Sequence, residues 1–136
     1  MIIAVDFDGT IVEHKYPSIG KEKPFAVETL RQMAADGHRL ILWTVRSGDL
    51  LEEAVAWCRQ RGLEFYAVNS NQPPGALFEY PHDASPKIAA NIFIDDSNLG
   101  GIPDWDEIYR LVSHRQKHRK KRHKGPRCWL RKLLGR

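Results

Sequence analysis

The sequence has few of the features that mark secreted and membrane proteins. Its only two cysteines, Cys58 and Cys128, lie far apart and form neither a disulfide framework nor a zinc site. No apolar run approaches the roughly 18 residues that a membrane-spanning helix needs. The apolar residues at positions 1–5 lack the charged segment that opens a signal peptide. These absences favour a cytoplasmic protein in a reducing compartment.

Positive and negative charges are separated along the 136 residues. Residues 1–113 hold 10 Lys and Arg side chains and all 17 acids, whereas residues 114–136 hold the other 11 Lys and Arg and no acid. The overall charge of +4 therefore describes neither part. With 42% apolar residues, the chain has the composition of one globular domain. We predict a domain over residues 1–113 and a basic tail over 114–136.

Short apolar runs alternate with helical patterns along the predicted domain. Strands are predicted at residues 2–5, 40–43, 63–68 and 92–94. Helices are predicted to begin at Pro24, at a cap formed by Asp49, and near Trp105. Residues 69–86 have the composition of a loop, with an extended stretch at 76–80. This order predicts an α/β fold, a Rossmann-like three-layer sandwich with a mainly parallel sheet.

Charged and polar side chains follow three of the predicted strands, where the functional residues of a parallel sheet gather. They are Asp6 and Asp8, Thr44 and Arg46, and Asp95 and Asp96, with Lys87 shortly before the fourth strand. Carboxylates brought together repel one another, and a divalent cation relieves that repulsion. Magnesium suits a site of carboxylate and phosphate oxygens. An aspartate there can attack phosphorus as a nucleophile.

The segment Asp6-Phe7-Asp8-Gly9-Thr10 resembles motif I of the haloacid dehalogenase (HAD) superfamily of phosphohydrolases. Thr44 resembles motif II, which is a Thr or Ser closing the second strand. Lys87 stands in the region of motif III, and the pair Asp95-Asp96 resembles the two-aspartate form of motif IV. The resemblance covers residues 1 to about 113 and does not reach the tail.

The resemblance implies a role for each matched residue. Asp6 would be the nucleophile. Asp8 would be the general acid and then the base, and its backbone carbonyl would help Asp6 to hold Mg²⁺. Thr44 would bind a phosphoryl oxygen, and Lys87 would neutralise the charge of the phosphoryl group. Asp96 aligns with the direct metal ligand and Asp95 with a supporting position, although the order of the two is open.

Arg46 has two interpretations, a contact to a substrate phosphate or a cap on the loop after the second strand. The spacing of the motifs leaves no room for a cap domain, because 33 residues separate Thr10 from Thr44 and 42 separate Thr44 from Lys87. A capless site is open, so its wall would come from loops or from a neighbouring subunit of a homo-oligomer. The candidate wall is the loop at 69–86, with Phe78, Tyr80 and His82.

The resemblance implies a magnesium-dependent phosphomonoester hydrolase acting through an aspartyl-phosphate. Two alternatives stay open. One is a nucleic-acid end phosphatase that uses the basic tail, and the other is a non-catalytic module that binds a metal or a phosphorylated ligand.

The tail has two parts of different character. Residues 114–124 are almost uniformly basic, which predicts disorder or a solvated helix and attracts polyanions. At the end, Trp129, Leu130, Leu133 and Leu134 share one helical face among basic residues. A short amphipathic helix of this kind suits an anionic membrane surface, a protein groove or the acidic face of the domain itself. Three interpretations of the tail stay open: a solubilising or loosely anchoring appendage, a contact with nucleic acid, and docking on a membrane or a protein.

Overall fold

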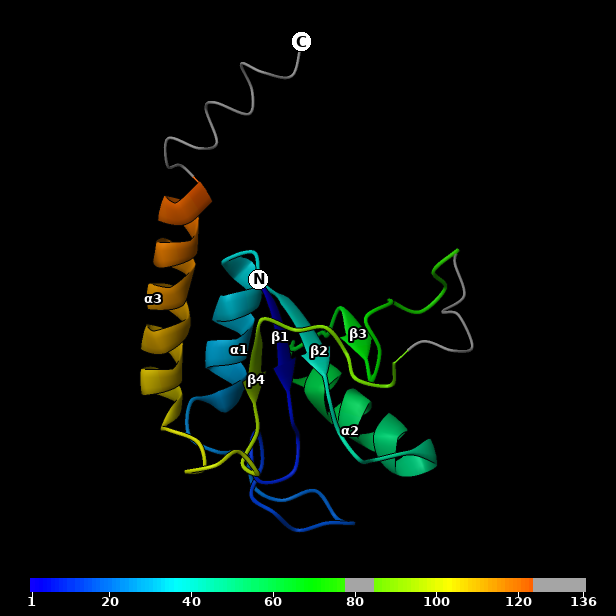
Figure 1. Cartoon of the computed structure of the whole chain (residues 1–136). Coiled ribbons are helices and arrows are strands. Elements are labelled where there is room, and N and C mark those ends of the chain that lie inside the picture. Colours follow the sequence, from blue (N-terminus) through cyan, green and yellow to red (C-terminus); the bar gives the residue numbers. More distant parts are fainter. Residues whose placement is uncertain (78–84, 124–136) are drawn as a thin grey trace.

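The computed structural model, which describes residues 1–77 and 85–123, is an α/β fold built on one parallel sheet (Figure 1). The strands are β1 (Ile2–Val5), β2 (Arg39–Leu42), β3 (Ala67–Val68) and β4 (Ile92–Ile94), in the order β3-β2-β1-β4. The helices are α1 (Ala26–Ala35), α2 (Gly48–Gln60) and α3 (Trp105–His123). The predicted fold class is confirmed, and the described residues contain no cap domain.

Several elements differ in extent from their prediction: β2 covers residues 39–42 instead of 40–43, and α1 begins at Ala26 instead of Pro24. The third strand covers only residues 67–68 instead of 63–68, because the N–H of Leu63 bonds to the carbonyl of Cys58 and so closes α2. The helix α2 begins at Gly48 with Ser47 as its cap residue, so Asp49 lies in the first turn and is not the cap. There its negative charge is favourable next to the positive end of the helix dipole.

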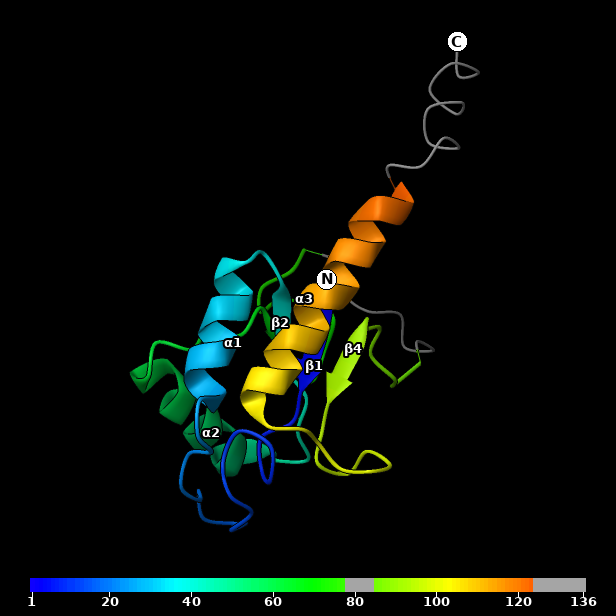
Figure 2. The same ribbon diagram turned by 90° about the vertical axis from the view of Figure 1, so that its left-hand side faces the viewer.

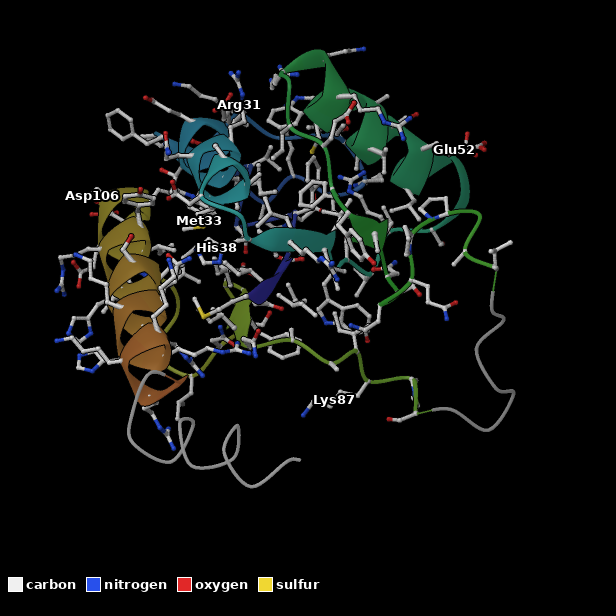
Figure 3. The ribbon with its side chains drawn as sticks, turned by 90° about the horizontal axis from the view of Figure 1, so that it is seen from above. Arg31, Met33, His38, Glu52, Lys87 and Asp106 are labelled. Atoms are coloured by element: carbon white, nitrogen blue, oxygen red, sulfur yellow. The ribbon has the colours of Figure 1, made fainter. Side chains whose placement is uncertain are left out.

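All three helices cover the same face of the sheet. The core on that face joins side chains of β1 and β2 to side chains of every helix, among them Leu30, Met33, Ala54, Cys58, Ile108 and Val112. The other face carries Ala4, Ile41 and Ala67, and Ile88 covers them from an extended segment before β4. Figure 3, which looks down on the molecule, shows the helices on one side of the sheet and this segment on the other. The third layer is therefore a segment of extended chain.

The handedness of the connections explains this arrangement. From β1 through β2 to β3 the chain advances in one direction across the sheet, and right-handed crossovers place α1 and α2 on one face. From β3 to β4 the chain returns past β2 and β1, so a right-handed crossover must use the other face. Asn71 fastens this segment by exchanging two 2.7 Å hydrogen bonds with the backbone of Ala89. The direction of the connections reverses between β1 and β4, where a binding crevice is expected.

The helix α3 is longer than predicted and continues into the basic segment. The predicted boundary between residues 113 and 114 therefore lies within a helix. Val112 is its last residue in the core, and α3 then extends beyond the sheet (Figure 2). No helix among the described residues is long and apolar enough to cross a membrane. The predicted wall residues Phe78, Tyr80 and His82 and the predicted amphipathic helix around Trp129 lie outside the described residues.

Candidate functional site

Three aspartates meet at the carboxyl ends of β1 and β4. Asp6 follows β1 directly, and Asp95 and Asp96 follow β4. The parallel register pairs Val5 with Ile94, and the N–H of Asp6 continues the ladder by donating to the carbonyl of Ile94 at 2.9 Å. One carboxylate oxygen from each aspartate lies within 4.8 Å of the other two. We call Asp6, Asp95 and Asp96 the aspartate cluster.

Thr10 and Gly9 set the geometry of the aspartate cluster. The buried hydroxyl of Thr10 donates to Oδ2 of Asp6 at 2.9 Å and accepts the N–H of Asp96 at 3.0 Å. Gly9 has a φ of +85°, and a Cβ at this position would collide with the carboxylate of Asp96. Neither residue was assigned a role of its own from the sequence. The feature of the sequence that could have identified them is the pair of small residues directly after Asp8. Small side chains at these positions let the residues after β4 approach the turn closely.

The electrostatics of the aspartate cluster disfavour three free carboxylates. Burial raises the pKa of Asp6 to about 6; the hydrogen bond from Thr10 opposes this rise, and the charges of Asp95 and Asp96 add to it. Asp6 and Asp95 are half-buried and Asp96 is exposed, so the cluster is open to solvent on one side. A cation placed among these oxygens would offset the repulsion.

The donor set fits a hard divalent cation. All three cluster residues offer carboxylate oxygens, and the cluster contains neither sulfur nor imidazole nitrogen. Oxygen-only sites of this kind suit Mg²⁺, Mn²⁺ or Ca²⁺ better than Zn²⁺. The open side leaves room for the waters and phosphate oxygens that Mg²⁺ retains as ligands. The predicted ligands Asp6, Asp95 and Asp96 are thus brought together. The carboxylate of Asp8 lies outside their cluster, and the predicted ligand atom of Asp8 is its backbone carbonyl.

Asp8 instead forms a buried ion pair with Arg46. The guanidinium donates from Nε to Oδ2 and from Nη2 to Oδ1, both at 2.7 Å, so the contact is bidentate. Arg46 is only 1% exposed, and the hydrogen bonds to Asp8 raise the pKa of its guanidinium. Bidentate, charge-assisted pairs are among the strongest hydrogen-bonded contacts in proteins.

The rest of the Arg46 guanidinium is also occupied. It donates to the carbonyls of Pro17 and Ser18, each at 3.0 Å, and lies 5.3 Å from the ring centroids of both Phe7 and Tyr16. The prediction that Arg46 binds a substrate phosphate or caps its own loop is therefore not supported in this arrangement. The guanidinium of Arg46 is instead paired with Asp8 and hydrogen-bonded to the carbonyls of Pro17 and Ser18.

Thr44 lies at the carboxyl edge of β2, as predicted. Its N–H donates to Oδ1 of Asn69 at 2.8 Å, and its hydroxyl accepts the N–H of Arg46 at 3.2 Å. The hydroxyl proton of Thr44 is left to donate to a ligand. Asn69 directly follows β3 with a φ of 48°, in the left-handed region that asparagine tolerates. Sequence reasoning placed Asn69 in a loop and missed its contact with Thr44.

Lys87 is not gathered with the other predicted site residues. It is exposed on the segment that covers the second face of the sheet, and its side chain points outward in Figure 3. Within residues 1–77 and 85–123, no hydrogen bond or ion pair joins its ammonium group to the aspartate cluster. Its predicted role in neutralising a phosphoryl group has no geometric support in this arrangement.

Comparison with known proteins shows one near structural relative. No family model matches the sequence, and no curated protein matches it. A solved structure of a conserved protein from Bacteroides thetaiotaomicron is similar, with 58% sequence identity and a TM-score of 0.78. The match covers 85% of this chain and 91% of that one. This similarity does not indicate an activity. At this identity and coverage, the chain belongs to the same family as this conserved Bacteroides thetaiotaomicron protein.

Proposed function

We propose that this protein is a magnesium-dependent phosphomonoester hydrolase of the HAD type. The observation that carries the proposal is the aspartate cluster at the point where the connections of the sheet reverse. Carboxylates held together at a half-buried position are costly, and groups with perturbed pKa values cluster at functional sites, which supports a functional role for Asp6. The resemblance of residues 6–10 to motif I of the HAD superfamily supports the same reading.

The aspartate cluster would hold Mg²⁺ through one oxygen of each of its three carboxylates. The cation, when bound, supplies positive charge that offsets the charge of the phosphoryl oxygens. Thr10 keeps Asp6 and the backbone of Asp96 in register for this purpose through its two hydrogen bonds.

Asp6 would supply the nucleophile. Its free carboxylate oxygen forms a bond to phosphorus while the bond from phosphorus to the ester oxygen breaks, which leaves an aspartyl-phosphate. The hydroxyl of Thr44 donates a hydrogen bond to a phosphoryl oxygen. Water then attacks the phosphorus of the aspartyl-phosphate, its proton passes to a base, and phosphate leaves with Asp6 restored.

Asp8 would act as the acid and base, and Arg46 would hold its carboxylate in place. Both oxygens of Asp8 accept hydrogen bonds from the guanidinium, so Asp8 takes a proton from water only when one of these bonds loosens. Before that, Asp8 must bring a proton to the ester oxygen and therefore has to loosen its bonds to Arg46. A leaving group of low pKa, such as a nitrophenolate, departs without that proton.

The absence of a cap domain from the described residues leaves the substrate class broad. The site is open at the carboxyl edge, so either a small phosphomonoester or the phosphorylated part of a macromolecule can approach it. A neighbouring subunit could complete its wall, and the homo-oligomer stays a prediction. The cytoplasm stays our proposed location, in keeping with the buried free thiol of Cys58.

A second candidate is a non-catalytic module that binds a cation or a phosphorylated ligand. Two observations favour it: both oxygens of Asp8 are engaged by Arg46, and Lys87 is exposed and unconnected to the aspartate cluster among the described contacts. Beryllium fluoride with Mg²⁺ separates the two candidates, because it traps a nucleophilic aspartate as a phosphate-like adduct. We expect an adduct on Asp6, and its absence would favour the module.

The alternative of a nucleic-acid end phosphatase needs the basic segment near the site. Residues 114–122 of α3 instead lie at the amino edge of the sheet, beside Met1 and Asn91, and the aspartate cluster lies at the carboxyl edge. The described geometry therefore favours a phosphomonoester that needs no contact with α3.

The decisive experiment is a phosphatase panel of sugar phosphates, nucleotides, phosphopeptides and DNA ends, with and without Mg²⁺. We expect activity only with the cation, and a loss of about 10³-fold or more in Asp6→Asn, because removal of a nucleophile disables the whole reaction. Asp106→Asn, at an exposed position in the first turn of α3, is the matched control and should keep full activity (Figure 3). Equal rates in the wild type and Asp6→Asn would exclude the proposed mechanism.

A further inference from the structure

The end of α3 is a helix with positive charge on almost every side. Between residues 114 and 122 it presents six Lys and Arg and two His, all exposed: His114, Arg115, Lys117, His118, Arg119, Lys120, Lys121 and Arg122. The last acid in α3 is Glu107, two turns before this segment begins. We call residues 114–122 the basic end of α3.

The position of the basic end sets it apart from the aspartate cluster. Arg115, His118, Arg119 and Arg122 line a groove of about 540 Å³ together with Met1 and Asn91, which precede β1 and β4. None of the described residues that line this groove is acidic. The groove therefore lies at the amino edge of the sheet, and the last turns of α3 project past that edge (Figures 1 and 2).

We propose that the basic end of α3 docks on double-stranded DNA by lying in the major groove between the two rows of phosphates. A helix with its side chains is about 10–12 Å in diameter, and the major groove is about 12 Å wide. Phosphates flank the groove on both sides, so a helix that is cationic all round can use most of its charges there. A flat anionic surface would meet only one side of it.

The composition of the basic end argues against other polyanionic partners. Residues 114–122 contain no apolar side chain, whereas a helix that binds in the membrane interface buries an apolar face. They contain no Phe, Tyr or Trp on which the bases of a single strand would stack. The deep, narrow major groove of duplex RNA does not admit a helix. Duplex DNA is the polyanion that these features favour.

This inference goes beyond the proposed phosphatase activity and does not depend on it. It uses other residues at the opposite edge of the sheet. DNA binding should therefore be the same in Asp6→Asn as in the wild type, and phosphatase activity should be unchanged when the basic end is neutralised.

The test is the binding of a fluorescently labelled 20-base-pair DNA duplex to the full chain between 50 and 200 mM salt. One variant combines Arg115→Gln, Arg119→Gln and Arg122→Gln, and a second combines Lys117→Gln, Lys120→Gln and Lys121→Gln. Glutamine keeps helix propensity while it removes charge. We expect each triple variant to bind at least tenfold more weakly, with a shallower salt dependence, because each lost phosphate contact removes about 0.9 from the slope.

The matched control combines Lys15→Gln, Arg31→Gln and Arg59→Gln, which remove the same charge from exposed positions elsewhere. It should bind within twofold of the wild type. The proposal is overturned if the control loses as much as the α3 variants, or if both α3 variants bind DNA like the wild type. Binding of the wild type to phosphatidylserine vesicles but not to the duplex would also overturn it. Circular dichroism verifies that α3 forms in each triple variant. If one of the two variants does not fold, DNA binding by the other variant still tests the proposal.

Discussion

The two edges of the sheet carry opposite charges and hold them in different surroundings. At the carboxyl edge, Asp6 is half-buried, hydrogen-bonded to Thr10 and close to two further carboxylates. At the amino edge, the cations of α3 are exposed on a helix that projects into solvent. Charge withdrawn from water costs free energy unless it is paired, whereas hydrated charge costs little. At the carboxyl edge, the free-energy cost of holding carboxylates together is itself an argument for a functional role. At the amino edge there is no such cost, so the argument rests only on the charge that the exposed cations offer to an anionic partner.

The ion pair of Asp8 and Arg46 extends this comparison into the core. Arg46 is a buried cation at the acidic edge and pairs with Asp8, whereas no ion pair among the described residues involves the aspartate cluster. Asp8 thus has a partner within the protein, Arg46, whereas the three aspartates of the cluster would share a bound cation. The predictions below test this division, beginning with the largest expected effect.

Arg46→Met should cost about 3–5 kcal/mol of unfolding free energy, because it leaves the buried carboxylate of Asp8 without its partner. Urea denaturation measures the loss. Arg31→Met, at an exposed position, should change stability by less than about 0.5 kcal/mol (Figure 3). The double variant Asp8→Asn with Arg46→Met should recover part of the loss, since no buried charge remains. Equal losses in the single and double variants would contradict the pairing argument.

Magnesium should stabilise the protein through the aspartate cluster. At a concentration about 100 times its Kd, a ligand that binds only the folded state adds about 2.7 kcal/mol to the unfolding free energy. Thermal unfolding with Mg²⁺ and then with excess EDTA measures the gain and its reversal. The gain should largely disappear in Asp95→Asn with Asp96→Asn. The same gain in the wild type and in this variant would place the cation elsewhere.

Asp8→Asn should reduce phosphatase activity by an amount that depends on the leaving group. We expect about 10–100-fold greater loss with an alkyl phosphate than with p-nitrophenyl phosphate, because general acid catalysis contributes only where the leaving oxygen needs a proton. The ratio of the two substrates within one variant cancels any loss of folded protein. An equal loss on both substrates would give Asp8 a structural role alone.

Gly9→Ala should destabilise the protein by about 1–3 kcal/mol, because it combines a positive φ with a collision against Asp96. Gly37→Ala is the matched control, since its φ of +88° is similar and a Cβ there meets no atom within 4 Å. The difference between the two variants in urea denaturation isolates the close approach of Asp96. Gly9→Ala should also weaken Mg²⁺ binding, which calorimetry measures, and equal behaviour of the two variants would contradict this role.

Neutralising the amino edge should have the smallest effect on stability. The triple variant Arg115→Gln, Arg119→Gln and Arg122→Gln should change the unfolding free energy by less than about 0.5 kcal/mol per site, because these side chains are exposed. Thermal unfolding of the triple variant beside the wild type measures this. A loss of several kcal/mol would show that these cations are structural and would remove the contrast between the two edges.

Most of the fold could be predicted because it follows from local patterns. The apolar runs before Asp6 and Asp95 predicted two strands that end in aspartate, and parallel strands bring their carboxyl ends to the same edge. The third strand was predicted too long, since a pattern of apolar residues cannot show that Leu63 is used to close a helix. The length of α3 was also missed, because its basic residues carry no apolar periodicity beyond Val112.

The site was only partly predictable because its partners come from distant parts of the chain. Asp8 and Arg46 are 38 residues apart, and the carbonyls of Pro17 and Ser18 complete the environment of Arg46. No spacing rule links these positions, so a phosphate contact was an equally good interpretation of an arginine after the second strand. Asn69 was missed for the same reason, because its contact with Thr44 depends on the pairing of β3 with β2.

The sequence by itself determined a parallel α/β sheet, the meeting of Asp6, Asp95 and Asp96 at its carboxyl edge, and the separation of acidic and basic charge along the chain. Only the tertiary structure decided which aspartate has an internal partner, where Lys87 lies, and that the basic end of α3 lies at the edge opposite the aspartate cluster. The periodicity of each element and the polar residues that follow each strand depend on neighbours in the sequence. The partner of a buried charge and the direction of a closing helix depend on how distant segments pack.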